Sequence, residues 1–81
     1  MPRQFDNHSK RMDLYHAIVY FRRRKGLSQE QLAEELGISR QHLASIEAPN
    51  MDGGISLELL FNIATVLEIE PYQLLKFRPE E

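Results

Sequence analysis

Apolar residues recur along this chain at the spacing of an α-helix, and no segment alternates between apolar and polar residues as a β-strand does. The first apolar stripe has members at i, i+3, i+4 and i+7: Leu14, Ala17, Ile18 and Phe21. This stripe predicts a helix over about residues 10–25. Gly26 follows a last turn rich in cations, and both features favour the end of a helix at this point.

Two short helices are predicted next from the residues at their ends. Ser28 and Gln31 have the spacing of a capping box, in which two side chains satisfy free backbone N–H groups at a helix start. Gly37 ends this helix, because glycine readily adopts the left-handed conformation that closes a helix. Ser39 caps a third helix, which runs to about Glu47 and ends before a proline.

A fourth and a fifth helix follow a loop at residues 48–54. Ser56 is the predicted N-cap of the fourth helix. Its apolar arc is wide enough to face a core and consists of Leu57, Leu60, Ile63, Ala64 and Leu67. Pro71 suits the first position of a short fifth helix, although Glu70 before it is an unfavourable N-cap. The pattern therefore predicts an all-α protein with a compact five-helix fold.

Size and composition indicate the domain organisation and exclude several classes of protein. With 81 residues the chain is one small domain, so we expect a flexible arm at 1–10, a helical domain at 11–77 and a tail at 78–81. There is no cysteine, which excludes disulfides and cysteine-ligated zinc. The longest apolar run is far short of the ~18–20 residues that span a bilayer, and the N-terminus is too polar for a signal peptide. We therefore expect a cytoplasmic protein without a membrane partner.

No arrangement of residues favours catalysis. The sequence supports no Ser/His/Asp grouping, no Gly-rich phosphate loop and no site of paired carboxylates. The three histidines, His8, His16 and His42, lack the spacing of metal ligands. We therefore predict that the protein is not an enzyme and uses no metal or cofactor. The net charge of −2 argues mildly against a nucleic-acid partner, yet residues 22–25 form a block of four cations.

Residues 28–47 carry the clearest functional signal, because a tight turn at 37–39 joins two short helices in a helix-turn-helix arrangement. This segment and its surroundings resemble the lambda-repressor/Cro-like, or XRE-type, DNA-binding domains. The matching residues are Arg22, 26–33, 36–39, Leu43, Ile46, Glu47, Ser56, Leu57, Leu60, Ile63, Ala64, Leu67, Pro71, Leu74 and Leu75. The resemblance covers about residues 12–77 and implies a lambda-repressor-like fold that binds DNA and regulates transcription.

The third helix has a distinct outward face. On a helical wheel Leu43 and Ile46 set the buried direction, and four residues point away from it: Arg40, Gln41, Ala44 and Ser45. Arginine can pair with guanine, glutamine with adenine, and a methyl group can meet the thymine methyl. The resemblance implies that this helix enters the major groove and that the four residues contact bases. Without that context, such a face would be ordinary solvated surface.

Phosphate contacts are implied mainly at the start of the second helix. Gln29 occupies its first position, where free N–H groups and the helix dipole attract anions, and the resemblance makes it a phosphate contact. Ser28 and His42 are further candidates, although the first is mainly a cap and the second mainly structural. Related proteins often touch phosphate from a basic loop after the third helix. Here residues 48–54 hold no Lys or Arg, which leaves Asn50 or backbone amides for that contact.

An ion pair between Arg22 and Glu47 is also expected. The helical wheel places Glu47 at the edge of the core-facing side of the third helix, and Arg22 follows the apolar Phe21 at the end of the first helix. The resemblance implies that these two positions pair an arginine with a glutamate. A partly buried pair of this kind restrains geometry more than it adds net stability.

A homodimer on a pseudo-palindrome is predicted, because one short helix reads too few base pairs to discriminate against a genome of nonspecific sites. On the fourth helix Leu59 and Val66 lie opposite the core-facing stripe. We expect them to form the dimer interface together with Leu75 and Phe77. The alternative is that these residues pack beneath the C-terminal helix or the N-terminal arm.

The sequence therefore predicts a regulator of transcription that binds double-stranded DNA sequence-specifically and reads the major groove with the helix at 39–47. The alternative is a helix-turn-helix protein-interaction module, or an antitoxin, whose main partner is another protein. The net charge of −2 is the best support for that alternative.

Overall fold

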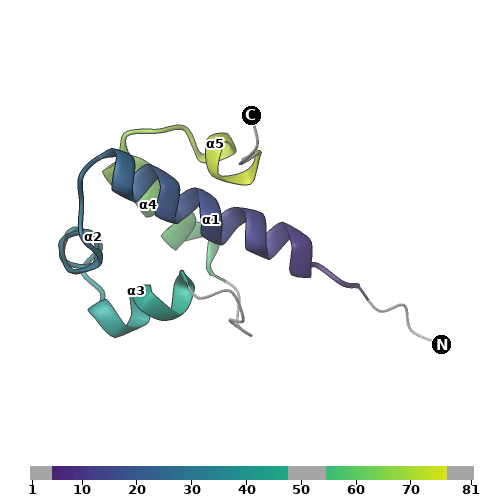
Figure 1. The fold of residues 1–81 in the computed structure, drawn as a ribbon, viewed down its shortest axis with the longest axis horizontal. Coiled ribbons are helices and arrows are strands. Elements are labelled where there is room, and N and C mark those ends of the chain that lie inside the picture. Colours follow the sequence, from purple (N-terminus) through teal and green to yellow (C-terminus); the bar gives the residue numbers. More distant parts are fainter. Residues whose placement is uncertain (1–4, 48–54, 77–81) are drawn as a thin grey trace.

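The computed structural model describes residues 5–47 and 55–76, which form five helices and, within these ranges, no strand (Figure 1). In chain order they are α1 (His8–Arg24), α2 (Gln29–Leu36), α3 (Arg40–Ile46), α4 (Leu57–Leu67) and α5 (Pro71–Leu75). The prediction of an all-α, five-helix fold is confirmed. No helix in the described ranges has the length and apolar content that a bilayer span requires.

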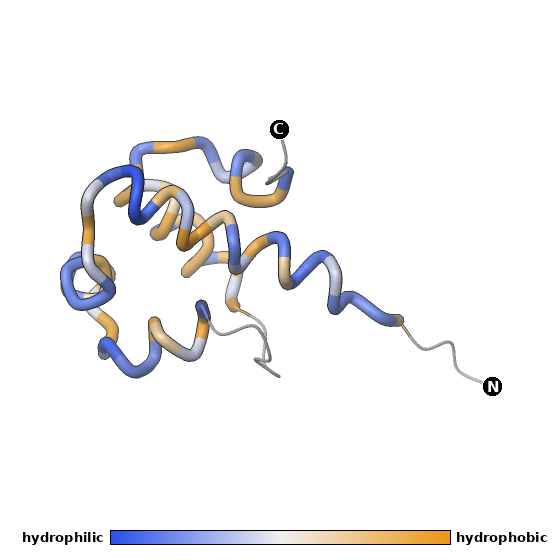
Figure 2. The backbone as a smooth tube through the Cα atoms, viewed as in Figure 1, coloured by the Kyte–Doolittle hydropathy of each residue, from blue (hydrophilic) through white to orange (hydrophobic). Residues whose placement is uncertain are grey.

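All five helices contribute to a single core. Its largest fully buried side chains are Ile18, Leu32, Leu43, Ile46, Ile63 and Leu74. Figure 2 shows that the helices carry both hydrophobic and hydrophilic stretches, as expected of helices that pack around one core. Helix α1 packs against α4 and α5, while α2 packs against α3 and α4. Figure 1 shows α5 and α3 on opposite sides of α1, so the surface around α5 is distinct from the surface around α3.

The helix-turn-helix segment has the caps that the sequence predicts. The Ser28 hydroxyl accepts the backbone N–H of Gln31 at 3.0 Å, and the Gln31 side chain accepts the backbone N–H of Ser28 at 2.8 Å. Gly37 ends α2 with a φ of 72°, in the left-handed region. The Ser39 hydroxyl then accepts the backbone N–H of His42 at 3.0 Å and starts α3. The capping box therefore fixes the start of α2, Gly37 fixes its end, and Ser39 fixes the start of α3.

Replacing Gly37 by alanine is expected to lower the free energy of unfolding by about 1–2 kcal/mol. A Cβ at this position would have no heavy atom within 4 Å, so the cost is the left-handed backbone and not a steric clash. Asparagine tolerates this conformation better, so Gly37→Asn is the matched control and should cost less. Urea denaturation measures both variants. Equal stability of Gly37→Ala and the wild type would contradict this account of the turn.

The start of α1 differs from the expectation, whereas α5 begins at Pro71 as predicted. Helix α1 begins at His8 and not near Lys10, so the last residues of the predicted arm are helical. The carboxylate of Asp6 accepts the backbone N–H of His8 at 3.0 Å, which satisfies one of the free donors there. At α5 the Gln73 side chain accepts the backbone N–H of Glu70 at 2.9 Å. Gln73 thereby supplies a capping bond that the sequence analysis did not foresee.

Candidate nucleic-acid interface

The outward face of α3 is the first part of the candidate site. Leu43 and Ile46 are fully buried, which fixes the orientation of the helix. Arg40, Gln41 and Ser45 are exposed and Ala44 is half-buried, as the helical wheel predicted. Within the described part of the chain, Arg40 and Gln41 have no hydrogen-bond or ion-pair partner. Their donors and acceptors are therefore available to an external ligand.

Ser45 has less freedom than its neighbours. Its hydroxyl donates to the backbone carbonyl of His42 at 2.8 Å. A hydroxyl has one hydrogen to donate and two lone pairs, so Ser45 in this rotamer can only accept a hydrogen bond from a ligand. His42 itself has an exposed side chain and lies about one helical turn before Ser45.

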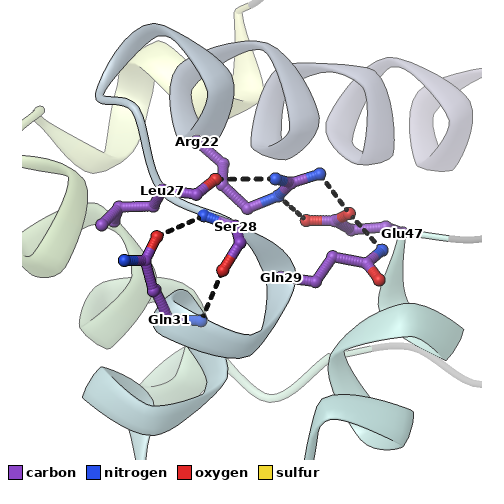
Figure 3. A network of polar contacts seen from close by, with 6 residues as sticks. All are labelled: Arg22, Leu27, Ser28, Gln29, Gln31 and Glu47. Atoms are coloured by element: carbon purple, nitrogen blue, oxygen red, sulfur yellow. Dashed lines mark hydrogen bonds and ion pairs between the residues drawn. The ribbon is translucent and has the colours of Figure 1, made fainter.

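A buried ion pair lies behind the start of α2 and joins three segments of the chain (Figure 3). Arg22, on α1, is 7% exposed. Its Nε donates to Oε2 of Glu47 at 2.9 Å and its Nη2 to Oε1 at 3.2 Å. Its Nη1 donates to the backbone carbonyl of Leu27 at 2.8 Å. The expected pair is therefore present, and it connects the end of α1, the α1–α2 loop and the C-cap of α3.

The predicted phosphate contact Gln29 belongs to the same network. Its Nε2 donates to Oε1 of Glu47 at 2.9 Å, and the residue is half-buried (Figure 3). No local spacing indicates this bond, because the two residues lie 18 positions apart, at the start of α2 and at the end of α3. Ser28, another candidate, is exposed, and its hydroxyl accepts the capping bond from Gln31. Asn50 lies outside the described residues.

The residues expected at a dimer interface have different environments. Leu59 and Val66 are partly buried against the core, which agrees with the alternative that they pack within one molecule. Leu75 is 62% exposed, and Phe77 lies outside the described residues. The large apolar side chains that α4 exposes are Leu57 and Phe61, at 64% and 47%.

The expectation that Leu57 belongs to the buried arc of α4 is wrong. Leu57 is the first residue of the helix and is 64% exposed, and the first buried residue of α4 is Leu60, one turn later.

No group of three or more His, Asp or Glu side chains in the described ranges could hold a metal ion.

Comparisons with known proteins bear on this site. Residues 18–74 match the family described as Helix-turn-helix (HTH_3). The HTH-type transcriptional regulator SinR of Bacillus licheniformis is 33% identical over 63 residues, which cover 78% of this chain and 56% of SinR. The chain thus spans little more than half the length of this regulator.

Solved structures show the same fold. The hypothetical transcription factor NHTF from Neisseria has a TM-score of 0.78 at 30% identity, over 99% of this chain and 91% of that one. The structure of SinR, a master regulator for biofilm formation, in complex with DNA has a TM-score of 0.69 at 32% identity. This match covers 76% of this chain and 97% of that one.

Proposed function

The chain belongs to the helix-turn-helix family of lambda-repressor/Cro-like (XRE-type) transcription regulators, and we propose that it binds double-stranded DNA sequence-specifically with α3 in the major groove. The observation that carries this proposal is that Arg40 and Gln41 are exposed, and without a partner among the described residues, on a helix oriented by buried Leu43 and Ile46. The similarity to SinR, whose structure contains DNA, supports the same conclusion.

Base reading follows from the chemistry of the α3 face. Arg40 can donate two hydrogen bonds to guanine, and Gln41 can both donate to and accept from adenine. Ala44 is half-buried and short, which lets the helix backbone approach the groove and places a methyl group near a thymine methyl. Ser45 acts as an acceptor, because its hydrogen is bound to the His42 carbonyl. Exocyclic amino groups of cytosine or adenine are suitable donors.

Phosphate binding is proposed at the start of α2. One N–H of the Gln29 amide is bound to Glu47, and the second remains for a phosphate oxygen. Backbone N–H groups of the first turn and the positive end of the helix dipole support an anion there. Contacts of this kind set the position of the protein on the duplex but carry no sequence information directly.

Replacing Gln41 by alanine is expected to relax base preference at one position of each half-site by ~1–3 kcal/mol, because one bidentate pair is lost. The dependence of affinity on salt should stay nearly unchanged, since no cation is removed. Binding to duplexes with each base at every position, repeated over a range of salt concentrations, measures both effects. Asn62→Ala is the matched control, because it removes an exposed amide from α4, outside the proposed interface. Wild-type preference and affinity in Gln41→Ala would contradict the assigned reading face.

Dimerisation is proposed through the side of the molecule that carries α5. Leu75 is 62% exposed and lines a groove with Leu14, Lys10, Arg11 and Asp13 of α1. Figure 1 shows α5 on the side of α1 away from α3, so an interface there would leave α3 free for DNA. Two copies would double the number of bases read and fit a pseudo-palindromic operator.

A protein partner is the second candidate function. Exposed apolar side chains on α4 and α5 favour it, because such groups commonly mark interaction surfaces when they gather. They are Leu57, Phe61, Tyr72 and Leu75, between 47% and 64% exposed. Binding to a protein but to no duplex at moderate salt would favour this candidate over the DNA-binding function.

A further inference from the structure

One carboxylate oxygen holds both the ion pair and the candidate phosphate contact. Oε1 of Glu47 accepts from Nε2 of Gln29 at 2.9 Å and from Nη2 of Arg22 at 3.2 Å (Figure 3). The Glu47 side chain is only 4% exposed, so it cannot itself reach an external ligand without moving. Gln29 is more exposed and begins α2. Glu47 therefore lies behind Gln29 as seen from solvent.

The chemistry of these groups fixes the orientation of the Gln29 amide. A carboxylate only accepts hydrogen bonds, so the amide nitrogen and not the amide oxygen must face Glu47. A flipped amide would set its carbonyl oxygen against the carboxylate. Phosphate also only accepts, so the second N–H on the same nitrogen is the side-chain group that can bind it. The bond to Glu47 holds this nitrogen in place before any ligand arrives.

Arg22 makes this arrangement compatible with an anionic ligand. An unpaired Glu47 carboxylate would repel a phosphate at Gln29, whereas the two bonds from Arg22 balance its charge. The same guanidinium binds the backbone carbonyl of Leu27, two residues before Gln29. The start of α2 is thus held through its backbone by Arg22 and through its first side chain by Glu47.

We propose that Glu47 is a positioning residue for DNA binding, which orients Gln29 toward a backbone phosphate without touching DNA itself. This inference rests on the proposed function and adds to it a coupling between the phosphate contact on α2 and the base-reading helix α3. Glu47 is the C-cap of α3, the helix proposed to read bases. Its bond to Gln29 fixes the distance between the phosphate contact on α2 and the base-reading face of α3, so the two contacts are set in one register.

A double-mutant cycle between Gln29→Ala and Glu47→Leu, which removes the acceptor of the Gln29 N–H, tests this role. Affinity is measured by fluorescence anisotropy for a duplex carrying the motif that the wild-type chain selects. Gln29→Ala is expected to weaken binding about 10- to 100-fold, as loss of one hydrogen bond to a charged group does. Glu47→Leu should weaken binding by a similar factor in the wild-type background, but less than twofold when Gln29 is already alanine.

Other cycle results overturn the proposal in distinguishable ways. Equal losses from Glu47→Leu in both backgrounds, or no loss at all, show that Glu47 does not act through Gln29. Unchanged affinity in Gln29→Ala removes the phosphate contact on which the proposal depends. A wild-type chain that binds no duplex overturns the proposed function together with this inference.

Two further measurements distinguish this positioning role of Glu47 from a purely structural one. Ile63→Val destabilises the core from α4, away from this cluster and from the proposed dimer interface, and is expected to bind DNA normally at temperatures where it is folded. The side-chain amide of Gln29, observed by ¹⁵N NMR without DNA, should be ordered in the wild type and mobile in Glu47→Leu. If Glu47→Leu does not fold, Glu47→Asp, which is too short to hold Gln29, gives the same readout. A mobile Gln29 amide in the wild type contradicts the proposal.

Discussion

Replacing Arg22 by methionine is expected to lower the free energy of unfolding by about 3–5 kcal/mol, because it leaves a buried carboxylate without a counter-charge. The Glu47 side chain is 4% exposed and receives two of its bonds from Arg22. Adding Glu47→Leu removes the stranded charge, so the double variant should regain most of the lost stability. Urea denaturation of the single and double variants measures these changes.

The ion pair between Lys25 and Glu68 is the matched control for this experiment. Like the buried pair, it joins a basic residue at the end of α1 to a glutamate, but it lies on the surface. The Lys25 ammonium hydrogen-bonds to the Glu68 carboxylate and lowers its pKa. Lys25→Met should nevertheless change stability little, because solvent screens exposed pairs. If the losses of unfolding free energy in Arg22→Met and Glu47→Leu simply added in the double variant, the two buried charges would not be coupled, and this account of the pair would be contradicted.

Inserting five base pairs between the two half-sites of the operator is expected to weaken binding more than about 100-fold. Half a helical turn rotates one half-site to the opposite face of the duplex. All base contacts of one subunit are then lost, and each is worth about 1–3 kcal/mol. Titration of both duplexes with the same protein measures the loss.

Two controls accompany the spacing experiment. An insertion of about ten base pairs restores the rotational phase and separates rotation from distance. Leu75→Glu places a charge on the exposed side chain proposed for the dimer interface and should reduce the monomer–dimer affinity. A dimer that survives this change would move the interface elsewhere. Tight binding by a single monomer, insensitive to spacing, would contradict the dimer itself.

The sequence predicted those parts of the fold that depend on local chemistry. The bonds of Ser28 and Ser39 join residues three positions apart, so their spacing alone indicates them. The end of α4 was not predictable in this way. Glu68 closes it with a φ of 58°, while the N–H of Ile69 donates to the Ala64 carbonyl at 3.0 Å. No glycine marks this position, so packing decides a conformation that the residue type disfavours.

The candidate site was predictable to the extent that helical periodicity determines it. The wheel placed Arg40 and Gln41 outward because Leu43 and Ile46 had to face the core. The bond from Gln29 to Glu47 was not foreseen, because it depends on how α2 and α3 cross and not on any spacing in the chain. The partial burial of Leu59 and Val66 likewise follows from tertiary packing, which a wheel of one helix does not contain.

Selection of bound duplexes from a random DNA pool, followed by sequencing, tests the proposed function most directly. The account predicts an enriched inverted repeat whose half-sites lie about one helical turn, ~34 Å, apart. Gln41→Ala should recover the same repeat with one position of each half-site relaxed. Recovery of no enriched motif by the wild-type chain at moderate salt would contradict sequence-specific DNA binding and favour a protein partner.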